Sequence, residues 1–183
     1  KDFKVWTGEA RYTSPDDQRA RWIVGAFIQD VTNIRVDDFG PLLFGAEAAR
    51  YRTLSTQTAV FGQISVDLTD ALELTGALRY DRDNRRVKVR GVDTGALVEA
   101  REKVFDKVTP KISLAYRVTA DHLLYATYGQ GFKTGGFNPP PGPGDIHQSV
   151  FRPEKTKAFE AGVKTGWLAG RLLLDLAAFK TNY

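Results

Sequence analysis

The sequence contains no cysteine, no methionine and only two histidines. Without cysteine, a disulfide framework and a thiolate metal site are both excluded. The histidines, His122 and His147, lie in different predicted connections, so we expect no shared metal site. No apolar run approaches the ~18 residues of a membrane helix. A membrane-spanning strand needs only about 9–11 residues, half of them apolar, so a β-barrel stays open.

Motifs for catalysis or cofactor binding are also missing. The sequence has no nucleophile elbow, and no serine, histidine and aspartate that can be placed together. The glycines at 129, 131 and 135 have the wrong spacing for a dinucleotide loop, and Pro139–Pro141 follow where a helix should begin. Asp37-Asp38 is typical of a turn. We therefore expect no enzyme activity, no cofactor and no metal site.

The charge is mildly basic, with a formal net charge of +4. Acidic residues are interleaved with basic ones, as in the run Asp81-Arg82-Asp83-Asn84-Arg85-Arg86. Such mixing favours solvated protein faces over a nucleic-acid interface. We expect no nucleic-acid partner.

Alternation of apolar and polar residues is the strongest pattern present. Leu72–Tyr80 places leucines and Tyr80 on one face, and Glu73, Thr75 and Arg79 on the other. Side chains alternate across a strand, so this period predicts a strand with one apolar and one charged face. Similar stretches predict eight strands, at Phe3–Thr13, Arg21–Val31, Thr58–Leu68, Leu72–Tyr80, Val108–Val118, Leu123–Phe132, Thr156–Trp167 and Arg171–Tyr183.

The predicted connections are alternately short and long. Tight turns near Thr69, Thr119 and Ala169 recur about every fifty residues. The long connections are Thr32–Ser55, in which 46–51 is expected to form a helical turn, Asp83–Lys103, a mixture of strand extension and loop, and Lys133–Pro153. Short turns at one end and long loops at the other are typical of outer-membrane barrels. The sequence thus predicts an all-β fold, an antiparallel up-and-down transmembrane β-barrel segment of about eight strands.

Two alternatives remain at this point. A self-contained eight-stranded barrel would have to fill its interior with side chains. A soluble β-sandwich that binds carbohydrate through exposed aromatics would also show alternation. Aromatic residues near the predicted strand ends, such as Tyr80 and Trp167, favour the membrane. The last strand follows a tight turn and runs toward the loop end, so we expect further strands beyond this sequence to cover the open edge.

Two blocks of sequence carry a family resemblance. GFKTGGFN (131–138) and FRPEKTKAFEAGVKT (151–165) resemble the late-barrel signature of TonB-dependent outer-membrane receptors. The resemblance implies a barrel of about 22 strands with an N-terminal plug, of which residues 1–183 would form part. It also implies energised uptake of a scarce nutrient, by default a ferric siderophore, at the outer membrane of a Gram-negative bacterium. The implied partners are outer-membrane lipid and lipopolysaccharide, the plug domain of the same chain, and the TonB–ExbB–ExbD complex.

Eight residues are candidates for transport. The alternation places five charged side chains on the lumen wall, namely Arg79, Lys111, Arg117, Glu160 and Lys164. Three residues would stand at the mouth of the last long loop, namely Phe132, Lys133 and Phe137. The alternative for the wall charges is that they pair with one another, or with the plug, without touching a ligand.

Overall fold

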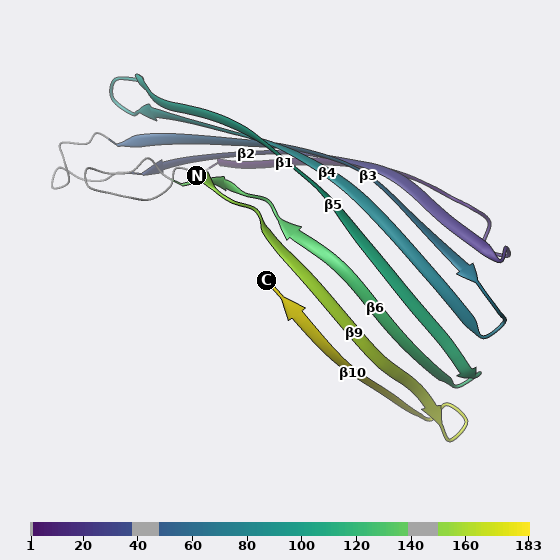
Figure 1. The fold of residues 1–183 in the computed structure, drawn as a ribbon. Coiled ribbons are helices and arrows are strands. Elements are labelled where there is room, and N and C mark those ends of the chain that lie inside the picture. Colours follow the sequence, from purple (N-terminus) through teal and green to yellow (C-terminus); the bar gives the residue numbers. More distant parts are fainter. Residues whose placement is uncertain (1, 38–47, 139–149) are drawn as a thin grey trace.

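The computed structural model describes residues 2–37, 48–138 and 150–183, and its regular structure is β-strand throughout. Eight strands form one antiparallel sheet in sequential order (Figure 1). They are β1 (Asp2–Thr13), β2 (Ala20–Asp37), β3 (Ala49–Asp67), β4 (Leu72–Gly91), β5 (Leu97–Thr119), β6 (His122–Lys133), β9 (Glu154–Trp167) and β10 (Leu172–Asn182). A separate pair, β7 (Gly136–Phe137) and β8 (Val150–Phe151), lies between β6 and β9 in the chain. This meander confirms the predicted all-β, up-and-down fold.

Short turns gather at one end of the sheet, which we call the turn side. They lie at residues 14–19, 68–71, 120–121 and 168–171. The connections at the opposite end, the loop side, occupy residues 38–48, 92–96 and 134–153. The predicted division into a turn end and a loop end is therefore confirmed.

Several predicted boundaries are wrong on the loop side. β2 continues to Asp37 and β3 begins at Ala49, so the connection between them is shorter than Thr32–Ser55. The expected helical turn at 46–51 is contradicted at residues 49–51, which belong to β3, while 46 and 47 lie outside the described residues. Most of Asp83–Lys103 is strand, since β4 ends at Gly91 and β5 begins at Leu97.

The pairing register divides the sheet into two faces. Residues directly opposite one another on paired strands share a face. We call the face that carries Arg79 and Asp81 the inner face, because the β7–β8 pair packs against it, and the opposite face the outer face. On the turn side, the outer face of the strands is a run of apolar or small residues, apart from the opposed pair His122 and Thr165 at the turn ends of β6 and β9. On β4 this run is Leu72, Leu74, Gly76, Leu78 and Tyr80.

Each outer-face run ends at a polar residue as the strand approaches the loop side. We call these residues the boundary row: Lys4, Asp30, Thr58, Arg82, Asp106, Gln130, Lys157 and Lys180. The nine residues of Leu72–Tyr80 extend for about 30 Å at ~3.3 Å per residue. A strand tilt of about 35–45° reduces their height to about 20–25 Å, close to the lipid-facing band of an outer-membrane barrel.

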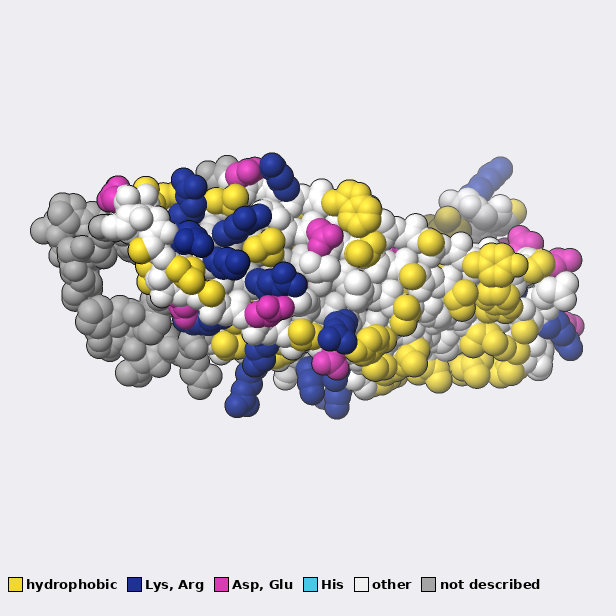
Figure 2. Space-filling model, turned by 90° about the horizontal axis from the view of Figure 1, so that it is seen from above, with side chains coloured by type: hydrophobic (Ala, Val, Ile, Leu, Met, Phe, Trp, Pro, Cys, Tyr) yellow, Lys and Arg dark blue, Asp and Glu magenta, His cyan; other side chains and the backbone are white. Residues whose placement is uncertain are grey.

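Beyond the boundary row, β4 carries charged side chains on its outer face and buried apolar side chains on its inner face. On β4 the outer face now carries Arg86, Lys88 and Arg90, which are exposed, while the inner face carries Val87 and Val89, which are buried. These valines pack with Tyr51 into the buried cluster of the sheet. Figure 2 shows Lys and Arg gathered toward the end that bears the grey loops, and hydrophobic side chains toward the other end.

The sheet is an open single layer within the described residues. There, β1 pairs only with β2 and β10 only with β9, so the strands do not close on themselves. A β-sandwich needs two broad sheets packed face to face. In the described residues the second sheet is only the two-stranded β7–β8 pair, so the arrangement is not a sandwich. Apolar side chains also occur on the inner face of the edge strands, such as Leu173 and Phe179 on β10. Across the described ranges no helix is long and apolar enough to span a membrane.

Candidate functional site

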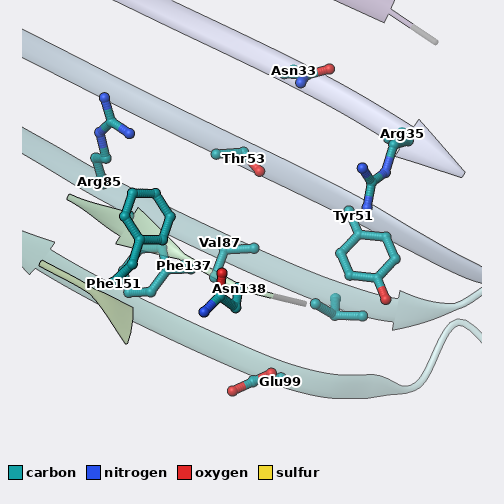
Figure 3. A pocket seen from close by; sticks show the side chains of 12 residues that line it. Asn33, Arg35, Tyr51, Thr53, Arg85, Val87, Glu99, Phe137, Asn138 and Phe151 are labelled. Carbon is teal, nitrogen blue, oxygen red and sulfur yellow. The ribbon is translucent and has the colours of Figure 1, made fainter. Parts of the chain in front are cut away.

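A cavity of about 220 Å³ lies on the inner face of the loop side. The sheet forms one wall, and the β7–β8 pair forms the other (Figure 3). Its lining residues are Asn33, Arg35, Tyr51, Thr53, Arg85, Val87, Val89, Glu99, Gly136, Phe137, Asn138 and Phe151. The cavity thus combines aromatic side chains, two arginines and several amide or hydroxyl groups.

Gly135 and Gly136, at the start of β7, allow this strand to lie close to its neighbours. A Cβ atom on Gly136 would lie 2.5 Å from Cζ of Phe151. One on Gly135 would lie 2.5 Å from the carbonyl oxygen of Phe151 and 2.6 Å from the ring of Phe105. Real Cβ atoms do not approach so closely, so glycine at both positions lets Phe137 reach the cluster of Tyr51, Val87 and Val89.

Arg35 and Tyr51 form one end of the cavity (Figure 3). The Arg35 guanidinium pairs with Asp37 at 2.6 Å and lies 5.1 Å from the centre of the Tyr51 ring, within cation–π range. Its Nε atom is buried and has no hydrogen-bond partner among the described residues. Burial, and then the nearby Asp37 carboxylate, raise the pKa of the Tyr51 phenol, so Tyr51 stays neutral.

Arg85 stands at the other end, beside Phe137 and Phe151 (Figure 3). Its Nε donates to Asp83 at 2.9 Å, and the Ser55 hydroxyl donates to the same carboxylate at 2.6 Å. Asp83 is only 2% exposed, so this carboxylate is a fixed anchor for the Arg85 side chain.

A band of paired charges continues along the inner wall toward the turn side. Arg79 donates to Asp81 at 2.9 Å, and Gln57 donates to the same carboxylate at 3.0 Å. The Arg79 guanidinium also lies 5.3 Å from the ring centre of Phe27 and 5.6 Å from that of Phe61. The wall charge at Arg79 is therefore held by one buried carboxylate and two aromatic rings.

The other predicted wall residues also lie on the inner face, but the structure does not bring them together. Glu160 accepts a hydrogen bond from the Tyr125 hydroxyl at 2.7 Å, and Lys164 lies 4.0 Å from Asp175. Lys111 pairs in the sheet with Ala77, on the same face as Arg79. Arg117 lines a second hollow, of about 490 Å³, on the turn side.

The three predicted mouth residues occupy different positions. Phe137 lines the cavity. Lys133 ends β6 and lies 3.8 Å from Glu154, with both side chains largely exposed. Phe132 lies opposite Lys155 on the outer face and is not among the cavity residues.

Of the residues that line the cavity, sequence reasoning proposed only Phe137 and missed the others, among them Arg35, Tyr51 and Arg85. A signal was present in Val87-Lys88-Val89-Arg90, which alternates as a strand should. It was hidden because its apolar residues fall on the opposite face from those of Leu72–Tyr80 in the same strand.

The sequence matches a known protein family and is similar to several known receptors. The family model described as "TonB dependent receptor-like, beta-barrel" matches residues 2–183. The metal-pseudopaline receptor CntO of Pseudomonas aeruginosa is 29% identical over 123 residues, which cover 63% of this chain and 16% of CntO. The pesticin receptor of Yersinia enterocolitica is 27% identical over 133 residues, covering 72% of this chain and 19% of that receptor.

Solved structures share the fold. The ferric yersiniabactin uptake receptor FyuA of Yersinia pestis superposes with a TM-score of 0.79 at 20% identity, covering 98% of this chain and 28% of FyuA. The ferric-catecholate import receptor Fiu of E. coli K12 gives a TM-score of 0.72 at 18% identity, covering 98% of this chain and 31% of Fiu. The chain therefore spans less than a fifth of the receptors it matches in sequence, and less than a third of these structural neighbours.

Proposed function

Since this chain belongs to the TonB-dependent receptor β-barrel family, we propose that it forms part of the wall and the ligand mouth of an outer-membrane receptor that imports a ferric siderophore. The family match over residues 2–183 is the observation that carries the proposal. The relatives are described as receptors for metal–pseudopaline, pesticin, ferric yersiniabactin and ferric catecholates. A chelated metal ion is the ligand class common to most of these descriptions.

The cavity on the loop side suits such a ligand. Tyr51, Phe137 and Phe151 offer aromatic surface, and Arg35 and Arg85 offer positive charge. Chelating groups such as carboxylates and phenolates leave a metal complex with negative or polar oxygens, which arginine binds through charge-assisted hydrogen bonds. The unpartnered Nε of Arg35 supplies a donor for this purpose. We therefore assign ligand contact to these residues and to the predicted mouth residue Phe137.

The remaining predicted residues take other roles in this proposal. Arg79, Lys111, Arg117, Glu160 and Lys164 face the lumen, where a plug domain from elsewhere in the same protein would sit. Lys133 lies at the rim beside the mouth, and Phe132 faces outward. The energy for uptake would come from the TonB–ExbB–ExbD complex through segments outside this chain, and the apolar outer face of the turn side would lie in the outer-membrane lipid of a Gram-negative bacterium.

Ligand titration of the full-length receptor tests the mouth. Tyr51→Ala removes an aromatic wall of the cavity, and we expect it to weaken binding of the cognate ferric siderophore by about tenfold or more, as truncation of a buried aromatic anchor does at other binding sites. A panel of ferric hydroxamates, catecholates and mixed chelators, followed by quenching of tryptophan fluorescence, would identify the cognate class. Phe137→Ala should have a similar effect from the opposite wall.

Leu54→Ala is the matched control, because Leu54 lies on the same strand as Tyr51 but on the outer face. It should leave ligand binding unchanged. If wild type, Tyr51→Ala and Leu54→Ala all bind the siderophore equally, the mouth does not lie at this cavity. If the wild-type receptor binds no member of the panel, the siderophore assignment is wrong.

A further inference from the structure

On the loop side, β5 extends well beyond the end of its pairing with β6 (Figure 1). The last pair of the β5–β6 ladder is Lys111 with Gly129. From 109 back to 102, β5 stays paired with β4, but in the described residues no strand pairs with its other side. We call residues 102–109 the β5 edge. About half of its backbone N–H and C=O groups point away from β4, because those of an antiparallel strand face its two sides alternately.

Pro110 lies where the ladder with β6 stops. Proline has no amide hydrogen to donate, so a sheet accepts it at an edge or at a bulge. Beyond Gly129, β6 continues only to Lys133 and stays paired with β9 instead. The parting of β5 and β6 leaves a strand edge of the kind to which another extended chain can add.

The side chains of the β5 edge differ between its two faces. On the inner face, Lys103 and Lys107 flank the buried ring of Phe105, and the Lys103 ammonium lies 5.5 Å from the centre of that ring. On the outer face, Val104 and Val108 are exposed. A strand added here would therefore meet lysine with one set of its alternating side chains and valine with the other.

Positive charge gathers at this edge without a compensating acid. In the part of the chain that the structure describes, no carboxylate lies within ion-pair distance of Lys107 or of two lysines of β9, Lys155 and Lys157. The charge of Lys155, and then partial burial, lower the pKa of the Lys107 ammonium. A carboxylate brought to this edge would relieve the repulsion among these cations.

The two acids of the β5 edge do not supply that carboxylate. Glu102 and Asp106 both lie on the outer face, away from the inner row of lysines. Arg86 pairs with Glu102 at 3.1 Å, and Arg82 lies opposite Asp106 in the ladder. The acids are thus placed beside arginines of β4, and the charge of the inner lysines is left for a partner.

We propose that the β5 edge binds an extended, acidic segment of another protein, which adds to β5 as a further strand. The backbone of the segment bonds to β5, its acidic side chains face Lys103 and Lys107, and its alternate apolar side chains pack beside Val104 and Val108. In strand addition the backbone bonds supply affinity and the alternating side chains supply specificity. Exposure of this edge to the outside of the cell rests on the proposed function, whereas the edge itself does not.

The charges favour an acidic segment over a second copy of this chain or a free anion. If two β5 edges paired antiparallel about Phe105, Lys103 of one copy would lie opposite Lys107 of the other. Like charges directly opposite one another destabilise a sheet, and charged edge strands resist such self-pairing. A free anion would need the lysines, but neither the backbone edge nor the two valines.

The test is binding of a synthetic peptide to the full-length receptor in detergent, measured by fluorescence anisotropy and amide hydrogen exchange. The peptide alternates glutamate and valine over about eight residues, which is a usual strand length. We expect it to bind and to slow exchange in residues 102–109, with no change in residues 72–80. A peptide with lysine in place of glutamate should bind about tenfold more weakly, because like charges reject a partner.

Two double variants and a modified peptide separate charge from backbone pairing. Lys103→Glu/Lys107→Glu should weaken binding of the glutamate peptide by about tenfold and strengthen binding of the lysine peptide, a gain that requires a folded edge. Arg52→Glu/Lys88→Glu makes the same charge change at an exposed, directly paired site on the outer face of β3 and β4, and should bind normally. Methylation of the peptide amides removes backbone donors without changing charge and should abolish binding.

Three results would overturn the proposal. The first is equal binding of the methylated and unmethylated peptides, which indicates attraction of charge alone. The second is equal binding of the glutamate peptide by the two double variants. The third is slow exchange, in the receptor alone, of the edge amides that point away from β4, which shows that the edge is filled within the receptor or by a second copy.

Siderophore binding measured on the same samples separates this proposal from the transport function. It should be normal in both double variants, because neither changes a residue of the cavity. Its absence from the wild type would count against the transport function and not against strand addition at the β5 edge.

Discussion

β4 passes through two environments, and its two halves are built in opposite ways. In Leu72–Tyr80 the apolar side chains occupy the outer face and the charged ones the inner face. In Arg82–Gly91 the outer face carries Arg82, Arg86, Lys88 and Arg90, and the inner face carries the buried Val87 and Val89. Since the pairing of β3 with β4 is continuous across this change, the strand does not shift its register.

The difference shows that the surroundings of each face, and not the strand itself, set the residue pattern. An outer face in lipid must be apolar, whereas the same face in water can be charged. On the inner face the requirement reverses, because the β7–β8 pair covers the loop side and excludes water from Val87 and Val89. Asp81 and Asp83, at 3% and 2% exposure, lie where the two patterns meet and are both held by hydrogen bonds.

The largest effect should come from a charge on the lipid-facing side. Leu74→Arg places a cation on the outer face of the turn side, and we expect it to destabilise the folded receptor by ~2–4 kcal/mol if it lies near the bilayer midplane. Leu54→Arg makes the same change on the same face of the loop side, where we expect no more than about 0.5 kcal/mol. Urea unfolding in lipid vesicles would measure both. Equal costs would remove the distinction between the halves.

Two glycines allow the inner and outer faces of the turn side to be compared. Gly25 lies on the inner face, where an added Cβ would collide with the Phe61 ring and lie 2.8 Å from the carbonyl oxygen of Ala10. Gly25→Val should therefore cost ~1–3 kcal/mol through overpacking, and it should also disturb the stacking of Arg79 on Phe61. Gly76→Val, on the open outer face, should cost less. A larger cost for Gly76→Val in the same unfolding assay would contradict the assignment of the two faces.

Where the two halves of β4 meet, the buried carboxylate of Asp83 accepts hydrogen bonds from Arg85 and Ser55. Asp83→Ala leaves Arg85 and Ser55 without their acceptor, and we expect a loss of ~1–2 kcal/mol in the free energy of unfolding. Asp70→Ala removes an exposed turn-side carboxylate that lies 3.5 Å from Arg19, and it should change stability by less than about 0.5 kcal/mol. If the two variants are equally stable, Asp83 is not a structural anchor.

The smallest effect concerns pH at the outer face of the loop side. The pKa of Glu102 is lowered in the folded chain by the hydrogen bond from Asn84 and then by Arg86. Its contribution to stability is therefore present above the ordinary glutamate pKa and is lost as pH falls through the lower, folded value. The protection factors of the β4–β5 hairpin, which are the exchange rates corrected for the intrinsic effect of pH, should fall in acid, and Glu102→Gln should reduce this pH dependence. An unchanged pH profile in Glu102→Gln would contradict the role of this carboxylate.

The contrast between the halves also explains what the sequence could predict. The turn-side strands are predictable because one face is uniformly apolar, as in Leu72–Tyr80. The loop-side extensions, such as Arg82–Gly91, read as polar because charge on the outer face outweighs the two valines on the inner face. The inner-face placement of the five wall charges follows from the same alternation. The cavity does not, because it depends on β7 and β8 folding back against residues far away in the chain, such as Tyr51.

Mobility and accessibility of spin labels along β4 would test the exchange of environments most directly. The chain has no cysteine, so a single introduced cysteine is unique within it. Labels at Leu74 and Leu78 should collide with oxygen dissolved in lipid and be shielded from a water-soluble nickel chelate, whereas labels at Arg86 and Arg90 should show the reverse. If all four positions of the receptor in vesicles are equally accessible to the nickel chelate, the turn side does not face lipid, and the division of β4 into a lipid-facing half and a water-facing half is wrong.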